Sequence, residues 1–317
     1  MMLSICMITY NHEKYIAEAI EGVLMQKTDF PIELIIGEDC STDNTRDICL
    51  EYQRKYPDII KLLLPEKNQG MMQNAFNTLK ACTGKYIASC EGDDYWTDPY
   101  KLQKQVDFLE ANADFSICFH AVKIKKELEN IIVDDYITPQ VSDVTDIYRL
   151  AQGNYIHTPS VVFRKKESVL QSFVGLGDLR VGDYVLHILN AQYGKIKKIP
   201  DVMAVYRAGV GVWNVNDNRY RLEIWANMLD KLICLFAEDE KLTHILKQQY
   251  KYFLFALYNL YKREKDVDKA QSIFFTACVN YPDVILDEYE EISRNLQMIK
   301  HRKFYRFSNL LHRLFKF

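Results

Sequence analysis

The sequence predicts an α/β fold built around a mostly parallel sheet that is flanked by helices. Short apolar runs recur through the amino-terminal third of the chain, and each run stops at a group of polar residues. A segment with apolar residues at helical spacing follows each of the first three runs. This alternation is typical of parallel sheets, because the helix carries the chain back to the start of the next strand.

The predicted elements follow one another in chain order. The first strand starts at Leu3 and stops at the polar residues 9–11, and a helix is expected over residues 13–26. The next two strands with their helices are expected at 32–37 with a helix through residue 54, and at 59–64 with a helix over 73–81. A fourth strand, residues 85–89, leads into an acidic loop.

This loop contains three carboxylates in close succession. Glu91, Asp93 and Asp94 surround Gly92. Adjacent carboxylates repel one another at neutral pH, and their hard oxygens are the ligands of Mg²⁺ or Mn²⁺ bound to a substrate diphosphate. Gly92 would let the ion or a phosphate approach the backbone closely. The alternative is an acidic turn ahead of the helix that opens at Asp98.

Polar residues follow the carboxyl ends of all four predicted strands. They are Thr9, Asp39, Asn68 and Asp93. In parallel α/β sheets, ligands bind beyond the carboxyl ends of the strands. We therefore expect these four side chains to converge on one ligand site.

Three blocks of the sequence, in this order, resemble the signature of family 2 glycosyltransferases with a GT-A fold. The blocks are Thr-Tyr-Asn at 9–11, Glu-Asp-Cys-Ser-Thr-Asp at 38–43, and Gly-Lys-Tyr-Ile-Ala at 84–88 running into Glu-Gly-Asp-Asp at 91–94. The resemblance covers roughly residues 1–210. The chain departs from the family at Glu38 and Glu91, where Asp is frequent, and each substitution moves the carboxylate outward by one methylene.

The resemblance implies a nucleotide-sugar site at the first two blocks. Asp39 would accept a hydrogen bond from the N3–H of uracil or thymine, and it would disfavour cytosine, whose N3 is an acceptor. The other residues implied to line this part of the site are Thr9, Tyr10, Asn11, Glu38 and Asn68. The alternative is that Asp39 and Ser41 cap the helix that begins near residue 43, and the two roles are compatible.

The resemblance assigns the acidic loop to the donor phosphates. Asp93 would ligate a divalent cation, Mg²⁺ or Mn²⁺, which stabilises the leaving diphosphate as a Lewis acid. Glu91 would contact the ribose or a metal-bound water, and Gly92 belongs to the same site. Asp94 and Trp96 are expected on the acceptor or sugar side, where the indole ring would cover the apolar face of a pyranose. The alternative for Trp96 is a place in the hydrophobic core.

An inverting transfer also needs a base that takes the proton of the acceptor hydroxyl. Asp183 resembles the late acidic residue that the family places near the acceptor, and Asp178 is the second candidate. The alternative for Asp183 is an ordinary cap of the helix that follows it. Arg207 resembles the arginine of the family's closing motif, which approaches the diphosphate; a solvated surface arginine is the alternative.

Composition excludes some classes of function. The 317 residues carry a net charge of −3, which argues against a nucleic-acid binder that relies on phosphate contacts. The eight cysteines form no CxxC pair, which favours a reducing cytosol, and neither a signal peptide nor a membrane span is expected. His120 and His157 lie in apolar segments and are interpreted as buried histidines, not metal ligands. The turn at 158–160 is expected, by resemblance, to edge the acceptor cleft.

Two regions are predicted along the chain. Residues 1–212 form the nucleotide-sugar-binding catalytic domain, and residues 213–317 form a helical region in which glycine disappears after residue 218. Its end, residues 301–317, combines an apolar face with basic flanks. This pattern favours a helix on the anionic inner face of the cell membrane; the alternative is a helix packed on its own domain or on a partner subunit.

The sequence thus predicts a cytoplasmic, inverting, metal-assisted transfer of a sugar from a UDP-sugar to a hydroxyl of a glycan or lipid-linked acceptor. A sugar nucleotidyltransferase is the enzymatic alternative. Such an enzyme needs a glycine-rich basic loop after the first strand, where this chain has Thr-Tyr-Asn-His-Glu at 9–13. The non-enzymatic alternative is a glycan- or partner-binding protein on a degenerate GT-A fold.

Overall fold

The computed structural model describes residues 1–177, 179, 181–210, 218–280 and 282. The chain divides into two compact units, Met1–Tyr250 and Lys251–Phe317. This division falls inside the helical region, after the boundary between residues 212 and 213 that the sequence predicts.

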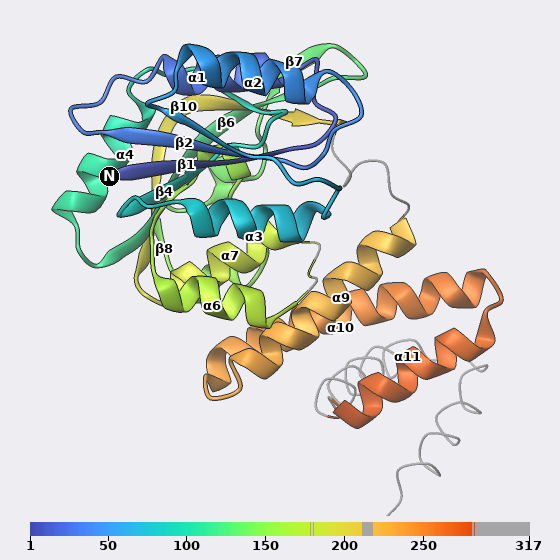
Figure 1. Ribbon diagram of the computed structural model, residues 1–317. Helices are drawn as coiled ribbons and strands as arrows, with labels where there is room; N and C mark the ends of the chain where they lie inside the picture. Colours follow the sequence, from blue (N-terminus) through green and yellow to red (C-terminus); the bar gives the residue numbers. More distant parts are fainter. Residues whose placement is uncertain (178, 180, 211–217, 281, 283–317) are drawn as a thin grey trace, which may run out of the picture. The chain divides into compact units, whose positions relative to one another are not determined.

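A single sheet forms the centre of the first unit (Figure 1). Its strands in the described residues are β1 Leu3–Thr9, β2 Ile32–Glu38, β3 Ile60–Leu63, β4 Tyr86–Ser89, β5 Tyr95–Trp96, β6 Phe115–Lys126, β7 Ile131–Asp134, β8 Val144–Thr145, β9 Val162–Arg164 and β10 Lys195–Ala208. The helices of this unit are α1 Ile16–Leu24, α2 Thr45–Lys55, α3 Met71–Ala81, α4 Lys101–Ala111, α5 Ile147–Leu150, α6 Glu167–Gly175, α7 Gly182–Ala191 and α9 Asn218–Leu235. Short 3-10 turns occur at Thr138–Gln140 and Thr158–Ser160.

The strand order is β3-β2-β1-β4-β9-β6-β10-β5, with β7 beside β6 and β8 beside β10. The first four strands in this order are parallel, and β6 and β10 are also parallel to each other. β9 runs antiparallel between β4 and β6, so the sheet is mixed. The α/β prediction is confirmed, and the predicted elements before residue 90 correspond to β1–β4 and α1–α3 with ends shifted by only a few residues.

Helices cover both faces of this sheet. Figure 1 shows α1 and α2 over one face and α3, α6 and α7 over the other. The strands between them are therefore buried on both sides, which explains why they read as continuous apolar runs. Two glycines allow helices to pack closely: a Cβ on Gly37 of β2 would lie 2.1 Å from Thr78 Oγ1 of α3, and one on Gly22 of α1 would lie 2.9 Å from the backbone nitrogen of Trp96.

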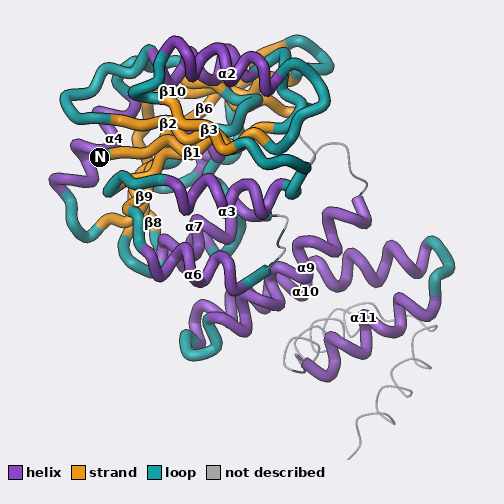
Figure 2. The backbone as a smooth tube through the Cα atoms, viewed as in Figure 1, coloured by secondary structure: helices purple, strands orange, loops and turns teal. Residues whose placement is uncertain are grey.

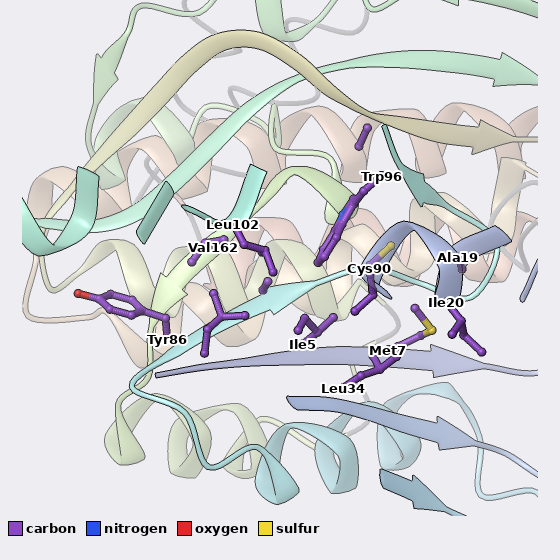
Figure 3. Packing of buried hydrophobic residues seen from close by; sticks show 14 of the residues in the cluster. Ile5, Met7, Ala19, Ile20, Leu34, Tyr86, Cys90, Trp96, Leu102 and Val162 are labelled. Atoms are coloured by element: carbon purple, nitrogen blue, oxygen red, sulfur yellow. The ribbon is translucent and has the colours of Figure 1, made fainter. Parts of the chain in front are cut away.

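Buried side chains from β1, β2, β4, α1 and α4 form the main hydrophobic cluster, part of which is drawn in Figure 3. Ile5, Met7, Ile20 and Leu34 are fully buried in it. Burying a large aliphatic side chain stabilises the fold by about 1.5–3 kcal/mol. This cluster therefore fixes the parallel strands whose carboxyl ends carry the predicted site.

The predicted helical region is confirmed over its described residues, which form α9, α10 Glu240–Arg263 and α11 Val267–Asn280. Figure 2 shows these segments as helices without strands between them. Within the described part of the chain, no helix has the length and apolar character that a membrane span requires. The predicted basic helix at 301–317 lies outside the described residues.

Candidate active site

The carboxyl ends of β1, β2 and β4 meet at one edge of the sheet. The backbone N–H of Asp39 donates to the carbonyl of Thr9 at 3.1 Å, and Asn68 Nδ2 donates to the carbonyl of Asp39 at 2.9 Å. In the loop that follows β1, His12 Nε2 lies 3.9 Å from Asp93 Oδ2. The structure therefore brings the residues that follow the four predicted strands, Thr9, Asp39, Asn68 and Asp93, to the same edge of the sheet.

Asp39 is 2% exposed, and both of its carboxylate oxygens accept hydrogen bonds from backbone. Oδ1 accepts from the N–H of Gln69 at 2.7 Å, and Oδ2 accepts from the N–H of Gly70 at 2.9 Å. Gly70 has a φ of 84°, in the region that glycine adopts most easily. Asp39 thus fixes the loop that leads into α3.

The start of α2 uses different side chains. Asp43 Oδ1 accepts from the backbone N–H of Thr45 at 3.0 Å. Ser41 Oγ accepts from the backbone N–H of Asn11 at 3.0 Å. The alternative in which Asp39 and Ser41 cap this helix is therefore wrong.

Asn11 joins the loop after β1 to the loop after β2. Its Oδ1 accepts from the backbone N–H of Thr42 at 2.8 Å, and its φ of 56° is a left-handed conformation that asparagine tolerates. Tyr10 is 39% exposed, whereas Thr9 is 2% exposed. Tyr10 and Asn11 are therefore the exposed residues of this block, and Asn11 ties the two loops together.

The nucleotide contact expected of Glu38 does not fit the structure. Glu38 is fully buried, its Oε1 accepts from the backbone N–H of Ser41 at 2.7 Å, and its Oε2 forms an ion pair with Arg46 of α2. Arg46 also donates through Nη2 to the carbonyl of Pro65 at 3.1 Å. The Glu38 side chain reaches the guanidinium on α2, so its carboxylate is satisfied inside the protein.

The expected role of Gly92 is also corrected. A Cβ on Gly92 would lie 2.6 Å from Thr9 Oγ1 and 3.0 Å from Ile16 Cδ1. The backbone N–H of Gly92 donates to the carbonyl of Ile8 at 2.9 Å. Glycine is needed here because the acidic loop packs directly on β1 and α1, and the space beside its backbone is filled by protein.

The carboxylates of the acidic loop have incomplete hydrogen bonding. Asp93 is 6% exposed and Asp94 is 1% exposed, and in the described structure Asp93 Oδ1 and Asp94 Oδ2 are buried without a hydrogen-bond partner. Burial raises the pKa of Glu91 to about 8, and the charges of Asp93 and Asp183 contribute to the shift. Burial also raises the pKa of Asp94 well above its usual range, with Asp93 and Glu91 adding to it. An unpaired buried carboxylate is costly, and a bound cation would remove that cost.

Asp94 does not lie where an acceptor role would require it. Its Oδ1 accepts from the backbone N–H of Arg207 at 2.7 Å. The side chain therefore faces β10 inside the protein, and the expected place of Asp94 on the acceptor side is not supported by its burial.

Asp183 lies in the first turn of α7 and is half-buried. Its Oδ2 accepts from Asn154 Nδ2 at 3.2 Å. The residue at the amino-terminal cap of α7 is Val181, so Asp183 is not the cap. Burial is the main cause of the raised pKa of Glu91 and of Tyr206, and the charge of Asp183 adds to both. The second candidate base, residue 178, lies outside the described residues.

Trp96 belongs to the hydrophobic core. It is 2% exposed, its Nε1 donates to the carbonyl of Pro159 at 2.8 Å, and Lys101 Nζ lies 4.2 Å from its ring centroid. Figure 3 shows the indole inside the cluster, near Leu102 and Cys90. The core alternative for Trp96 is confirmed, and the expectation that its ring covers a sugar is wrong because no face of the ring is accessible.

Arg207 is neither a solvated surface residue nor a free ligand for a diphosphate. It is 3% exposed, and its guanidinium forms ion pairs with Glu18 and Glu127. It also donates through Nη1 to the carbonyl of Asp93. Both expectations for Arg207 are therefore corrected by its burial among these partners.

Sequence reasoning missed Tyr206 and Asn154. Burial raises the pKa of the Tyr206 phenol, and the further causes are four carboxylates: Asp94, Glu91, Asp93 and Asp183. The phenol is therefore affected by the three carboxylates of the acidic loop and by Asp183. Its position beside Arg207 in the closing motif was the only available signal, and Asn154 gives none because it is far from Asp183 along the chain.

The two histidines of the apolar segments differ in their surroundings. His120 is fully buried in β6, with Nδ1 at 2.7 Å from the carbonyl of Ala121. His157 Nε2 lies 3.3 Å from Asp135 Oδ2, and its ring centroid is 5.1 Å from that of Tyr206. Across the residues that the structure describes, no three or more His, Cys, Asp or Glu side chains are arranged to hold a metal ion.

Known proteins are similar to this chain in sequence or in fold. The uncharacterized protein Rv1520 of Mycobacterium tuberculosis is 40% identical over 215 residues, which are 67% of this chain and 60% of that protein. The chain thus spans 60% of the length of this relative. Among solved structures, S. aureus TarS 1-349 in complex with UDP-GlcNAc has a TM-score of 0.60 at 17% identity, covering 87% of this chain and 91% of that one.

A second solved structure, the mannosyltransferase PcManGT from Pyrobaculum calidifontis in complex with GDP-Man and Mn²⁺, has a TM-score of 0.53 at 17% identity. It covers 97% of this chain and 83% of its own. These likenesses establish the GT-A fold. The family model described as glycosyl transferase family 2 matches residues 4–169, more than half of the 317 residues, and the chain belongs to this family.

Proposed function

We propose that this chain transfers a sugar from a UDP-sugar to a hydroxyl of a glycan or lipid-linked acceptor, with inversion at the sugar carbon. The observation that supports this most directly is that Asp93 and Asp94, at the carboxyl edge of the sheet, each have a buried carboxylate oxygen without a partner among the described residues. Burial also raises the pKa of Glu91 in this loop, and the charges of Asp93 and Asp183 add to the shift. TarS binds UDP-GlcNAc and PcManGT binds GDP-Man, which supports a nucleotide-sugar as the donor.

Asp183 is the proposed general base. Asn154 donates to its Oδ2 and orients the carboxylate, which is half-buried and keeps further lone pairs for the acceptor. A carboxylate in this position would take the proton from the acceptor hydroxyl as that oxygen attacks the sugar carbon. Asn154 would then set the direction from which the acceptor approaches.

Asp93 is the proposed ligand of a divalent cation, Mg²⁺ or Mn²⁺. Its Oδ1 is buried without a partner among the described residues, and a hard carboxylate oxygen suits either ion. A single protein carboxylate is compatible with Mg²⁺, which takes its other ligands from substrate phosphates and water. When bound, the ion would stabilise the negative charge that develops on the leaving diphosphate. The presence of Mn²⁺ in PcManGT supports this assignment.

Asp39 is the residue proposed to recognise the nucleotide base. Each of its carboxylate oxygens accepts one backbone N–H, from Gln69 and Gly70, and each retains a further lone pair. The N3–H of uracil would be a third donor, while Tyr10 is exposed enough to contact the ring. The backbone contacts hold the Asp39 carboxylate in one orientation before the nucleotide arrives.

We also propose that the enzyme works in the cytoplasm and attaches to the anionic inner face of the cell membrane through residues 301–317. The basic and apolar composition of this segment supports the proposal.

The test is a screen of nucleotide-sugars with the intact protein, with Mn²⁺ and with a chelator. We expect release of UDP from one UDP-sugar only when the metal is present, and calorimetry should give tighter binding of UDP than of CDP. Binding of nucleoside triphosphate with release of pyrophosphate would instead identify a nucleotidyltransferase. Glycan binding without turnover of any donor would identify a non-catalytic protein.

A further inference from the structure

We propose that Arg207 is a positioning residue that fixes the acidic loop, residues 90–94, in the orientation from which Asp93 meets its ligand. The inference rests on the proposed function, since it assigns Arg207 a role toward the metal and diphosphate. Arg207 itself would touch neither of them, because its guanidinium is enclosed by protein.

The guanidinium joins three separate parts of the fold. Nη1 donates to the carbonyl of Asp93, Nη2 donates to Glu18 of α1, and Nε donates to Glu127 Oε1 at 2.8 Å. Its centre also lies 4.8 Å from the ring centroid of Tyr15 and 4.6 Å from that of Tyr95. A planar, delocalised cation is needed for this arrangement, because it stacks on rings with its faces while it donates with its edges.

The backbone of Arg207 adds a second contact with the same loop. Its N–H donates to Asp94 Oδ1 at 2.7 Å. One residue of β10 therefore holds the main chain of Asp93 and the side chain of Asp94 at the same time. The Asp93 carboxylate takes no part in these contacts and is left for a ligand.

The rest of the acidic loop is anchored to the sheet through its backbone. The N–H of Cys90 donates to the carbonyl of Cys6 at 3.2 Å, and that of Gly92 donates to the carbonyl of Ile8 at 2.9 Å. The residues after Gly92, Asp93 and Asp94, are bonded to Arg207 and not to β1. Removal of the guanidinium would therefore take away the contact with the main chain of Asp93, while the contact of Asp94 with the Arg207 backbone, the pairing of β5 with β10 and the bonds to β1 remain.

Charge supports a positioning role over a ligand role. The guanidinium is paired with two carboxylates, Glu18 and Glu127, so its positive charge is already matched within the protein. A diphosphate would have to compete with both of them and with the carbonyl of Asp93. Partners behind a metal ligand orient that ligand, and their loss typically weakens metal affinity about 10- to 100-fold.

The experiment compares Arg207→Lys with a matched control, Arg164→Lys. Arg164 of β9 also joins separate parts of the fold: its Nε donates to the carbonyl of Phe115 at 2.8 Å, its Nη1 to the Tyr86 hydroxyl at 2.7 Å, and its Nη2 to the carbonyl of Asn112 at 3.1 Å. A lysine keeps the charge at either position but cannot make all the contacts of the planar fork. Mn²⁺-dependent binding of UDP is measured by calorimetry, and thermal unfolding is measured on the same samples.

We expect Arg207→Lys to bind UDP about 10- to 100-fold more weakly in the presence of Mn²⁺. Arg164→Lys should lose thermal stability yet bind UDP as the wild type does. Glu127→Gln, which disturbs only one partner of Arg207 at a partly exposed position, should weaken binding in the same direction by a smaller factor. This variant keeps the test decisive where Arg207→Lys fails to fold.

Wild-type affinity in a folded Arg207→Lys or in Glu127→Gln would overturn the inference, and so would an equal loss in Arg164→Lys. If the wild-type protein binds no UDP in the presence of Mn²⁺, the proposed function itself is wrong. If the wild type binds UDP and the variants bind it equally well, only the role of Arg207 is wrong.

Discussion

The carboxylates that follow β2 and those that follow β4 lie at the same edge of one sheet, but their environments are opposite. Both oxygens of Glu38 and both of Asp39 are bonded to protein donors. Asp93 and Asp94 each keep a buried oxygen without a partner in the described structure. Glu38 is therefore part of the folded scaffold, and Asp39 is held in one orientation by it. Asp93 and Asp94 carry unfavourable electrostatic energy that a bound cation would relieve.

A variant of Asp183 tests whether the region around the acidic loop takes part in sugar transfer. As a general base it should affect transfer far more than binding, because the proton moves only in the reaction. We expect Asp183→Asn to bind UDP normally and to lose sugar transfer by about 10²- to 10⁴-fold. Kinetics with a saturating donor and calorimetry with UDP check this. Unchanged turnover, or loss of UDP affinity with unchanged residual turnover, would make Asp183 a structural residue.

A variant of Asp93 tests the proposed role of the acidic loop toward the metal ion and the diphosphate. Asp93→Asn removes a charge at almost constant volume, and turnover should fall about 10²- to 10³-fold, the effect of losing one strong electrostatic contact in a transition state. Because the variant also removes repulsion with Glu91 and Asp94, its midpoint of thermal unfolding should stay equal or rise. Asp134→Asn on β7, whose side chain is 84% exposed, is the control and should change neither quantity. A lower unfolding midpoint would mean that Asp93 stabilises the fold.

Glu33 offers a further comparison with the acidic loop, because it is a buried carboxylate away from the site and both of its oxygens accept hydrogen bonds. Burial raises its pKa, but hydrogen bonds from Lys61, Ser4 and Thr83 outweigh burial and lower the pKa from 4.5 to about 2. The ionised form therefore stabilises the folded state above pH 4.5, and this contribution is lost as the pH falls from about 4.5 to about 2.

Glu33→Gln should accordingly lower the free energy of unfolding at pH 7, and the difference from the wild type should shrink to near zero by about pH 2. Denaturant unfolding at several pH values measures this. A difference that is independent of pH would mean that shape, and not charge, makes Glu33 important.

Asp39→Asn is expected to change both the stability of the fold and the preference for the base. In Asp39→Asn, the amide can accept from only one of the backbone N–H groups of Gln69 and Gly70, and the other is left facing an amide donor. We expect a loss of about 1–3 kcal/mol of unfolding free energy, together with a loss of the preference for UDP over CDP. A variant that keeps full stability and loses only base preference would show that the loop before α3 does not need this carboxylate.

The local pattern predicts the parallel half of the fold well. Strands buried on both faces appear as apolar runs, and the helices between them carry their own spacing, so β1–β4 and α1–α3 are visible in the sequence. The antiparallel strand β9 between β4 and β6 cannot be predicted from the sequence, because its three residues have no local pattern that indicates their partners.

The site residues divide in the same way. The meeting of Asp39 with the acidic loop follows from the order of parallel strands, which is a property of the fold class. The burial of Trp96 and Arg207 depends on partners distant in sequence, such as Pro159 for the indole and Glu18 for the guanidinium. Local composition around either residue is the same whether it faces solvent, ligand or core.

The insertion of β9 between β4 and β6 has a consequence for synthesis on the ribosome. β6 is made before β9, yet in the folded sheet β9 lies between β6 and β4, so β6 reaches the parallel strands only through a strand that is made later. The contact between Arg207 and Glu18 spans 189 residues of chain. Contacts of such large sequence separation form slowly, because a long loop must close before they contribute. β1–β4 can therefore collapse early on the emerging chain, but chains that stop before β10 lack the Arg207 contacts that tie the acidic loop to α1.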